Sequence, residues 1–203
     1  MNVCKYKLNN TIDCKINKNF FLDNHDLSFA LHCSQVIIYP TESVFGLGCD
    51  PDSEFAVKKL LDIKQRSWKK GLILVAAYYK QLINYIDDSS LNNVQRSRVF
   101  STWPGHISWS FPVHSNTPKW LIGDFSSLVV RLSSFKPIQE LCLSFGKPLV
   151  STSANISGYL PADNVDDVCD QLGLNLFIMD GSVGDMQHPS EIRSAVTGKL
   201  IRK

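Results

Sequence analysis

Short apolar runs that adjoin polar, glycine-containing loops are the feature of this sequence that most constrains its fold. The runs at residues 36–39 and 72–75 are too short for buried helices and fit buried strands. We expect strands at residues 36–39, 72–75, 107–111, 128–132, 148–150 and 176–179. Segments with helical spacing separate these runs, so the chain predicts an α/β fold with one mixed sheet in a single domain.

Several helices are expected between these strands. Leu27, Ala30 and Leu31 have helical spacing, and Ser53 followed by Glu54 suits the start of a helix that runs towards residues 64–66. Further helices are expected near residues 80–86, 136–145 and 164–172.

The remaining segments are expected to be less regular. Residues 41–48 are expected as a loop, and residues 195–201 as a small hairpin. Residues 107–111 alternate apolar and polar side chains, which predicts a half-exposed antiparallel strand. Residues 1–24 are polar without periodicity, so we expect a loosely ordered lead-in to a domain of residues 25–203.

Charge and cysteine content exclude some classes of protein. Lys and Arg number 21 against 19 Asp and Glu, and this small excess does not by itself indicate nucleic-acid binding. The six cysteines form no CxxC pair, so neither a zinc ribbon nor a disulfide framework is indicated. Reduced thiols in a cytoplasmic protein are the simpler interpretation. No stretch approaches the ~20 apolar residues that span a bilayer, so no membrane contact is expected.

Three polar loops lie beside the predicted strands or helices, where α/β folds bind ligands. Residues 41–48 carry two glycines, residues 64–71 carry four cations, and residues 151–158 carry four hydroxyls and an amide. Guanidinium and ammonium groups suit phosphate, and hydroxyls with backbone N–H groups suit anions. Each loop also has a plainer interpretation: a tight turn, favourable charge at a helix C-terminus, or ordinary Asx and Ser/Thr turns.

Several familiar catalytic motifs are missing. The sequence has no GxxxxGK[ST] phosphate loop, no GxSxG elbow and no HExxH helix. Its five histidines do not fall at metal-ligand spacing, so no protein-held metal is expected. If the chain uses ATP, its phosphates are bound by something other than a Walker loop.

Taken together, the motifs have a recognisable order. YPTE at residues 39–42 precedes GLG at residues 46–48, and KQR follows at residues 64–66. Further motifs are WPG at 103–105, SLVVR at 127–131, SANISG at 153–158, PSEIR at 189–193 and TGKLIR at 197–202. This order resembles the YrdC-like family in its short bacterial form, from about residue 27 onward.

The resemblance implies a fold and an activity. The fold would be a single YrdC-like domain with a twisted mixed sheet, flanking helices and a concave ligand-binding face. The activity would join L-threonine, bicarbonate and ATP into threonylcarbamoyl-AMP and pyrophosphate, with Mg²⁺ accompanying the ATP phosphates. Downstream proteins would then transfer the threonylcarbamoyl group to adenosine 37 of tRNAs that read codons starting with A.

The resemblance also implies roles for three sets of side chains. A catalytic cluster around the phosphates would consist of Lys64, Arg66, Ser153 and Asn155. ATP would also be bound by Ser127 and Arg202. Threonine would be bound by Thr41, Arg131, Ser151 and Ser190.

Three positions depart from the family pattern. His106 stands where the WPGP motif usually has its second proline, and Ser108 stands where threonine is usual. Pro161 falls where long-form members can have a nucleotide-contacting serine, so that contact is not carried over.

Two other functions stay open from the sequence. A YrdC-like domain could bind tRNA or double-stranded RNA without chemistry. The cluster of cations that favours such a surface consists of Lys58, Lys59, Lys64, Arg66, Lys69 and Lys70. An RNA-binding module, however, needs no threonine pocket. A related domain in hydrogenase maturation proteins activates carbamoyl phosphate, but the zinc-finger cysteines of those long chains are missing here.

Overall fold

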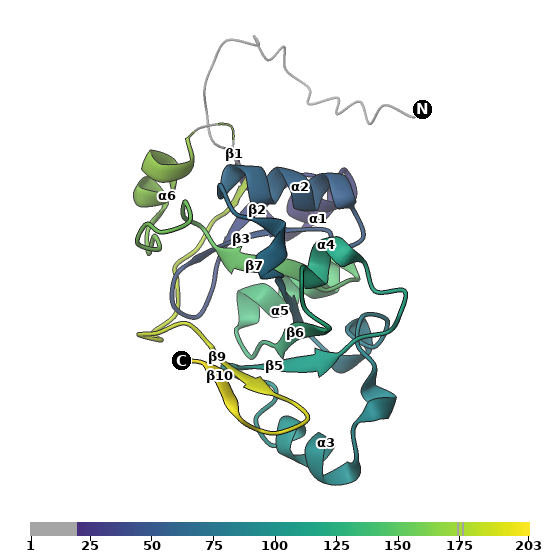
Figure 1. Ribbon diagram of the computed structural model, residues 1–203. Coiled ribbons are helices and arrows are strands. Elements are labelled where there is room, and N and C mark those ends of the chain that lie inside the picture. Colours follow the sequence, from purple (N-terminus) through teal and green to yellow (C-terminus); the bar gives the residue numbers. More distant parts are fainter. Residues whose placement is uncertain (1–19, 174, 176) are drawn as a thin grey trace.

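A ten-stranded mixed sheet organises the computed structural model, which describes residues 20–173, 175 and 177–203 (Figure 1). The strand order is β1-β8-β2-β3-β7-β4-β6-β5-β9-β10. The strands are β1 (Phe20–Leu22), β2 (Ile37–Pro40), β3 (Phe45–Cys49), β4 (Ile73–Ala76), β5 (Ile107–Pro112), β6 (Ser127–Leu132), β7 (Leu149–Ser153), β8 (Phe177–Met179), β9 (Glu191–Ser194) and β10 (Leu200–Arg202).

Helices cover both faces of this sheet (Figure 1). The α-helices are α1 (Asn24–His32), α2 (Glu54–Ile63), α3 (Asn93–Phe100), α4 (Lys119–Ile122), α5 (Lys136–Phe145) and α6 (Val165–Leu172). Three short 3-10 helices are η1 (Trp68–Lys70), η2 (Tyr79–Gln81) and η3 (Asp88–Ser90). The α/β class and the mixed sheet predicted from the sequence are confirmed.

Two apolar clusters hold the layers together. On one face, α1 and α5 pack on Ile37, Tyr39 and Val75. On the other face, α2 and α4 pack on the larger cluster, which includes Leu47 and Leu74. Burial of this kind of side chain stabilises a fold by roughly 1.5–3 kcal/mol each. The part of the first face beyond α1 and α5 carries polar side chains instead, and it forms the site described below.

Most predicted elements lie where the sequence places them. The predictions for α1, α2, α5 and α6 are confirmed, as are those for β2, β4, β6, β7 and β8. Ser53 caps α2, accepting a hydrogen bond from the backbone N–H of Ala56. The C-terminal hairpin is confirmed, but its turn occupies residues 195–199 between β9 and β10.

The loop predicted at residues 41–48 is partly wrong, because β3 begins at Phe45 and pairs antiparallel with β2. The ring of Tyr39 explains the two glycines of this strand. A Cβ atom on Gly48 would lie 2.7 Å from Tyr39 Cε1, and one on Gly46 would lie 3.1 Å from Tyr39 Cζ. The glycines thus make room for a side chain of the neighbouring strand.

Two further predictions are wrong. Strand β5 is buried rather than half-exposed, because Trp109 and Phe111 face the core while Ser108 and Ser110 are covered on the other side. Its antiparallel pairing with β6 is confirmed, although it also pairs in parallel with β9. The helix expected near residues 80–86 is only the short η2, and the sequence did not predict α3 or α4.

The amino-terminal segment is described only in part. Residues 1–19 of the predicted lead-in lie outside the described residues. Residues 20–22 form β1, which pairs in parallel with β8, so the sheet begins within that segment. None of the described helices has the length and apolar character required to cross a membrane.

Candidate active site

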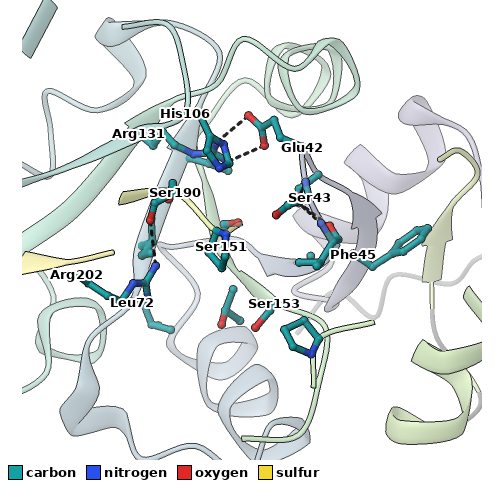
Figure 2. Close-up of a pocket in the computed structure, with 18 of the residues that line it drawn as sticks. Glu42, Ser43, Phe45, Leu72, His106, Arg131, Ser151, Ser153, Ser190 and Arg202 are labelled. Carbon is teal, nitrogen blue, oxygen red and sulfur yellow. Dashed lines mark hydrogen bonds and ion pairs between the residues drawn. The ribbon is translucent and has the colours of Figure 1, made fainter. Parts of the chain in front are cut away.

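A cavity of about 330 Å³ opens on the face of the sheet that α1 and α5 partly cover. Figure 2 shows residues that line this cavity. Val75 connects the cavity to the apolar cluster under α1 and α5, since it belongs to this cluster and also lines the cavity. The walls come from the segment after β2, from β3, β4, β6 and β7, from residues 189–190 before β9, and from the C-terminal residues. Segments far apart in the sequence therefore converge on one concave surface, as the sequence predicts.

The four side chains expected to bind threonine all line this cavity: Thr41, Arg131, Ser151 and Ser190. The three hydroxyl side chains among them are already oriented by hydrogen bonds. The Thr41 hydroxyl donates to the Val44 carbonyl at 2.6 Å, and Ser151 Oγ accepts from the Tyr39 hydroxyl at 2.7 Å. Ser190 Oγ lies 2.8 Å from Ser108 Oγ. The hydroxyls are thus held by the protein before any ligand binds.

Arg131 is paired with Glu42 in the cavity wall (Figure 2). Arg131 Nη1 donates to Glu42 Oε1 at 2.7 Å, and Nη2 donates to Oε2 at 2.9 Å. Ser133 Oγ donates a third bond to Oε1 at 2.7 Å. Both charged side chains are only 8% exposed. The end of the guanidinium is therefore occupied by this carboxylate, which fixes its orientation.

Burial and the Arg131 guanidinium have opposite effects on the pKa of the Glu42 carboxyl. Burial alone raises its pKa, but the charge of Arg131 and the hydrogen bonds from Arg131 and Ser133 lower it below the usual value. Glu42 is consequently ionised at neutral pH. The stability that this pair contributes is present above the ordinary glutamate pKa and is lost as the pH falls through the lowered value.

Two guanidinium groups from distant segments meet at the other end of the cavity. Arg66 and Arg202 both line it, together with Ser153. Arg66 Nη2 donates to the Gly71 carbonyl at 3.1 Å, while its buried Nε has no protein partner. Burial and the nearby Arg202 charge lower the pKa of Arg66, and burial lowers that of Arg202. Two partly buried cations, with no side-chain carboxylate beside them among the described lining residues, favour a polyanion such as a phosphate chain.

Lys64 and Asn155 lie behind the cavity wall and do not line it. Lys64 is only 2% exposed, and its ammonium donates to the Ser153 carbonyl, the Asn155 carbonyl at 2.7 Å and Asn155 Oδ1 at 3.2 Å. Asn155 Nδ2 donates to the carbonyls of Ile156 and Tyr159 at 3.0 and 2.8 Å. Burial and the Arg66 charge lower the pKa of Lys64 to about 8. These contacts fold the SANISG loop around the lysine.

Ser127, the remaining nucleotide prediction, begins β6 outside the lining. Its hydroxyl accepts a hydrogen bond from Ser110 Oγ at 2.9 Å. The structure thus brings seven of the ten predicted residues into the cavity and leaves Lys64, Asn155 and Ser127 outside it. Their roles toward a ligand stay predictions.

Some lining residues were given no role by the sequence. Glu42 belongs to the YPTE motif, which carried a signal, but its partner Arg131 is 89 residues away. His106 was noted only as a departure from the family pattern, and it lines the cavity beside Arg131. Thr152 belongs to the hydroxyl-rich loop of residues 151–158 but was given no role, and Lys203 extends the polar lining without any motif that singles it out.

Comparison with known proteins agrees with this geometry. The family model Sua5_yciO_yrdC, described as "Telomere recombination", matches residues 30–203. The threonylcarbamoyl-AMP synthase of Blochmanniella pennsylvanica is 62% identical over 178 residues, which are 88% of this chain and 92% of the relative. The enzyme of the same name from Yersinia enterocolitica is 54% identical over 178 residues, 88% of this chain and 94% of the relative.

Solved structures show the same fold at lower identity. E. coli YciO has a TM-score of 0.77 and 21% identity, covering 93% of this chain and 96% of that one. P. abyssi Sua5 complexed with L-threonine has a TM-score of 0.77 and 22% identity, covering 88% of this chain and 54% of that one. With its motifs, its sheet and these relatives in agreement, the chain belongs to the Sua5/YciO/YrdC family.

Proposed function

We propose that this chain is a threonylcarbamoyl-AMP synthase, which forms threonylcarbamoyl-AMP and pyrophosphate from L-threonine, bicarbonate and ATP. The observation that carries the proposal is the 62% and 54% identity to proteins of that name, each over 88% of the chain. The cavity supports it independently, because one end has hydroxyls around a fixed guanidinium and the other has two guanidiniums.

Threonine binds at the end of the cavity that holds Arg131. Because Glu42 occupies Nη1 and Nη2 of this guanidinium, a substrate carboxylate approaches its remaining donors. The hydroxyls of Thr41, Ser151 and Ser190 surround the amino acid and read its own hydroxyl. Valine has no hydroxyl, so it would leave the pocket hydroxyl that pairs with the threonine hydroxyl without this partner. The cost is ~1–3 kcal/mol, which favours threonine.

The ATP phosphates bind at the end that holds Arg66, Arg202 and Ser153. The threonine amine adds to carbon dioxide supplied by bicarbonate and loses a proton, giving a carbamate. A carbamate oxygen then attacks the α-phosphorus, and the bond to the bridging oxygen of the β-phosphate breaks to release pyrophosphate. The protein's task is to position these groups and neutralise charge, which is the main requirement of phosphoryl chemistry.

Mg²⁺ is expected to enter with ATP rather than on protein ligands. Glu42 is the one side-chain carboxylate among the described residues that line the cavity, and it is committed to Arg131 and Ser133. A magnesium ion held by the phosphates would supply further charge neutralisation for the departing pyrophosphate.

The remaining parts of the proposal concern partners and location. We expect downstream proteins to transfer the product to adenosine 37 of tRNA, and we place the enzyme in the cytoplasm.

Cys49 and Cys142 are buried thiols. Burial raises the pKa of both, that of Cys142 to about 12, so neither is a reactive nucleophile. Direct tRNA contact would use the exposed residues Trp68, Lys69 and Lys70 of η1, next to Arg66.

Pyrophosphate release tests the proposal. The pure protein is incubated with ATP, Mg²⁺, bicarbonate and threonine, and each substrate is omitted in turn. We expect release that requires both threonine and bicarbonate, and we expect valine to substitute poorly. Equal release without threonine would show that the cavity serves another reaction.

A further inference from the structure

His106 lies in the cavity wall with each ring nitrogen facing a different partner. Its Nε2 is 2.8 Å from the carbonyl oxygen of His188, and its Nδ1 is 3.4 Å from Arg131 Nη1. A carbonyl oxygen can only accept, so Nε2 carries the hydrogen. A guanidinium can only donate, so Nδ1 is bare. Both partners thus require the same neutral tautomer of this imidazole.

The two partners of His106 belong to separate parts of the threonine-binding end. Arg131 is on β6, whereas His188 is two residues before Ser190 in the β8–β9 connection (residues 180–190). This connection is mostly exposed, and backbone bonds hold its middle to the segment after β2: Gly184 N–H donates to the Thr41 carbonyl and Met186 N–H to the Glu42 carbonyl, both at 2.9 Å.

Near Ser190, side chains take over this anchoring. Ser190 Oγ is bonded to Ser108 Oγ on β5, and His106, just before β5, is bonded to the His188 carbonyl. Of the two anchoring side chains, Ser108 and His106, it is His106 that also contacts Arg131. It therefore ties the end of the β8–β9 connection to the guanidinium that Glu42 also holds, and Nη1 of Arg131 is shared by both contacts.

We propose that His106 is a positioning residue that sets the separation between Arg131 and Ser190, and so the fit of threonine in this enzyme. The inference rests on the proposed function, which assigns both residues to threonine. Small displacements of substrate-positioning groups have large effects, since a shift of ~1 Å can cost about a hundredfold in rate. The described hydrogen bonds of His106 go to His188 and Arg131 and not to Arg66 or Arg202, although Arg202 Nη2 donates to the Ser190 carbonyl at 3.5 Å.

Three substitutions separate the two contacts. His106→Ala removes both, His106→Gln keeps a donor near the position of Nε2, and His106→Asn keeps an acceptor near the position of Nδ1. His188→Ala is the matched control, because only the backbone carbonyl of His188 takes part. For His106→Ala we expect KM for threonine to rise about tenfold, the size expected for a lost hydrogen bond to a positioned side chain. KM for ATP and kcat at saturating threonine should change less than about twofold.

The conservative variants should each recover part of the threonine affinity, and His188→Ala should match the wild type. An unchanged KM for threonine in His106→Ala, or equal increases for threonine and ATP, would overturn the proposal. If the alanine variant does not fold, the glutamine and asparagine variants are tested in the same way. Each should raise KM for threonine more than KM for ATP.

Nuclear magnetic resonance provides a readout that needs no activity. Long-range ¹H–¹⁵N spectra of the full-length protein, with His106 assigned from the glutamine variant, should show a protonated Nε2 and an unprotonated Nδ1 at neutral pH. The opposite tautomer would contradict the two contacts on which the proposal stands. Wild-type protein without threonine-dependent pyrophosphate release would instead refute the proposed function, whatever the tautomer.

Discussion

At the scale of single residues, the sequence identified the site by motif but not the task of each side chain. Lys64 and Arg66 are two residues apart, yet one is buried at the C-cap of α2 and the other lines the cavity. The motif could not distinguish them, because burial of Lys64 depends on carbonyls of residues 153 and 155 that reach it only in the folded chain. For the same reason, the pairing of Glu42 with Arg131 could not be predicted.

This difference predicts separate effects for the two substitutions. Arg66→Ala should lower activity about tenfold to a hundredfold, since one charge-assisted contact to phosphate contributes ~1.5–3 kcal/mol. Its melting temperature should stay near that of the wild type. Lys64→Met should lower both the activity and the melting temperature, because three acceptors of the SANISG loop lose their donor. Kinetics and thermal melts of the two variants, measured together, check this prediction.

Two outcomes would contradict the assignment. Full turnover in Arg66→Ala would show that this guanidinium does not bind the phosphates. A Lys64→Met protein with normal stability but no activity would show that the ammonium acts on the ligand directly, as the family resemblance implied, rather than through the loop.

At the scale of elements, the apolar pattern predicted most of the elements that pack on the core, and it failed where the pattern was weak or interrupted by glycine. Helix α5 was predicted with its observed bounds, because Ile138, Leu141 and Phe145 form a buried stripe. Helix α3 was missed, because Val99 is its one buried residue and the pattern is therefore weak. Its capping box, Asn92 with Gln95, was the available signal. Strand β3 was missed because its glycines indicate a loop when Tyr39 is not considered.

The short helix η1 gives a prediction that separates an enzyme from an RNA-binding module. Lys69 and Lys70 are exposed and do not line the cavity, although they follow Arg66 closely in the sequence. The double change Lys69→Ala, Lys70→Ala should therefore leave adenylate formation within about threefold of the wild type, since remote exposed charges are screened by salt. A severe and salt-sensitive loss would favour an RNA surface, because backbone binding sums over cations. The assay is run at two salt concentrations.

At the scale of the whole molecule, the sheet brings four separate motifs to one concave face. The YPTE segment begins in β2 and continues beyond it, Ser153 of SANISG ends β7, Arg131 is on β6, and Arg202 ends the C-terminal hairpin. The sequence predicted the α/β class and the mixed sheet, since both follow from the alternation of short apolar runs and helices. It could not predict the strand order, because that depends on pairings between distant segments, such as β4 with β6 and β7.

The most direct test of this account is to identify the product. The wild-type protein is incubated with ATP, Mg²⁺, ¹³C-bicarbonate and ¹⁵N-threonine, and the mixture is separated under mild conditions for mass spectrometry. The proposed binding of threonine at Arg131 and of phosphates at Arg66 and Arg202, which all line one cavity, predicts a single adenylate that carries both labels, formed in equal amount with pyrophosphate. An adenylate of threonine that lacks the ¹³C label, or ATP hydrolysis without any labelled adenylate, would contradict it.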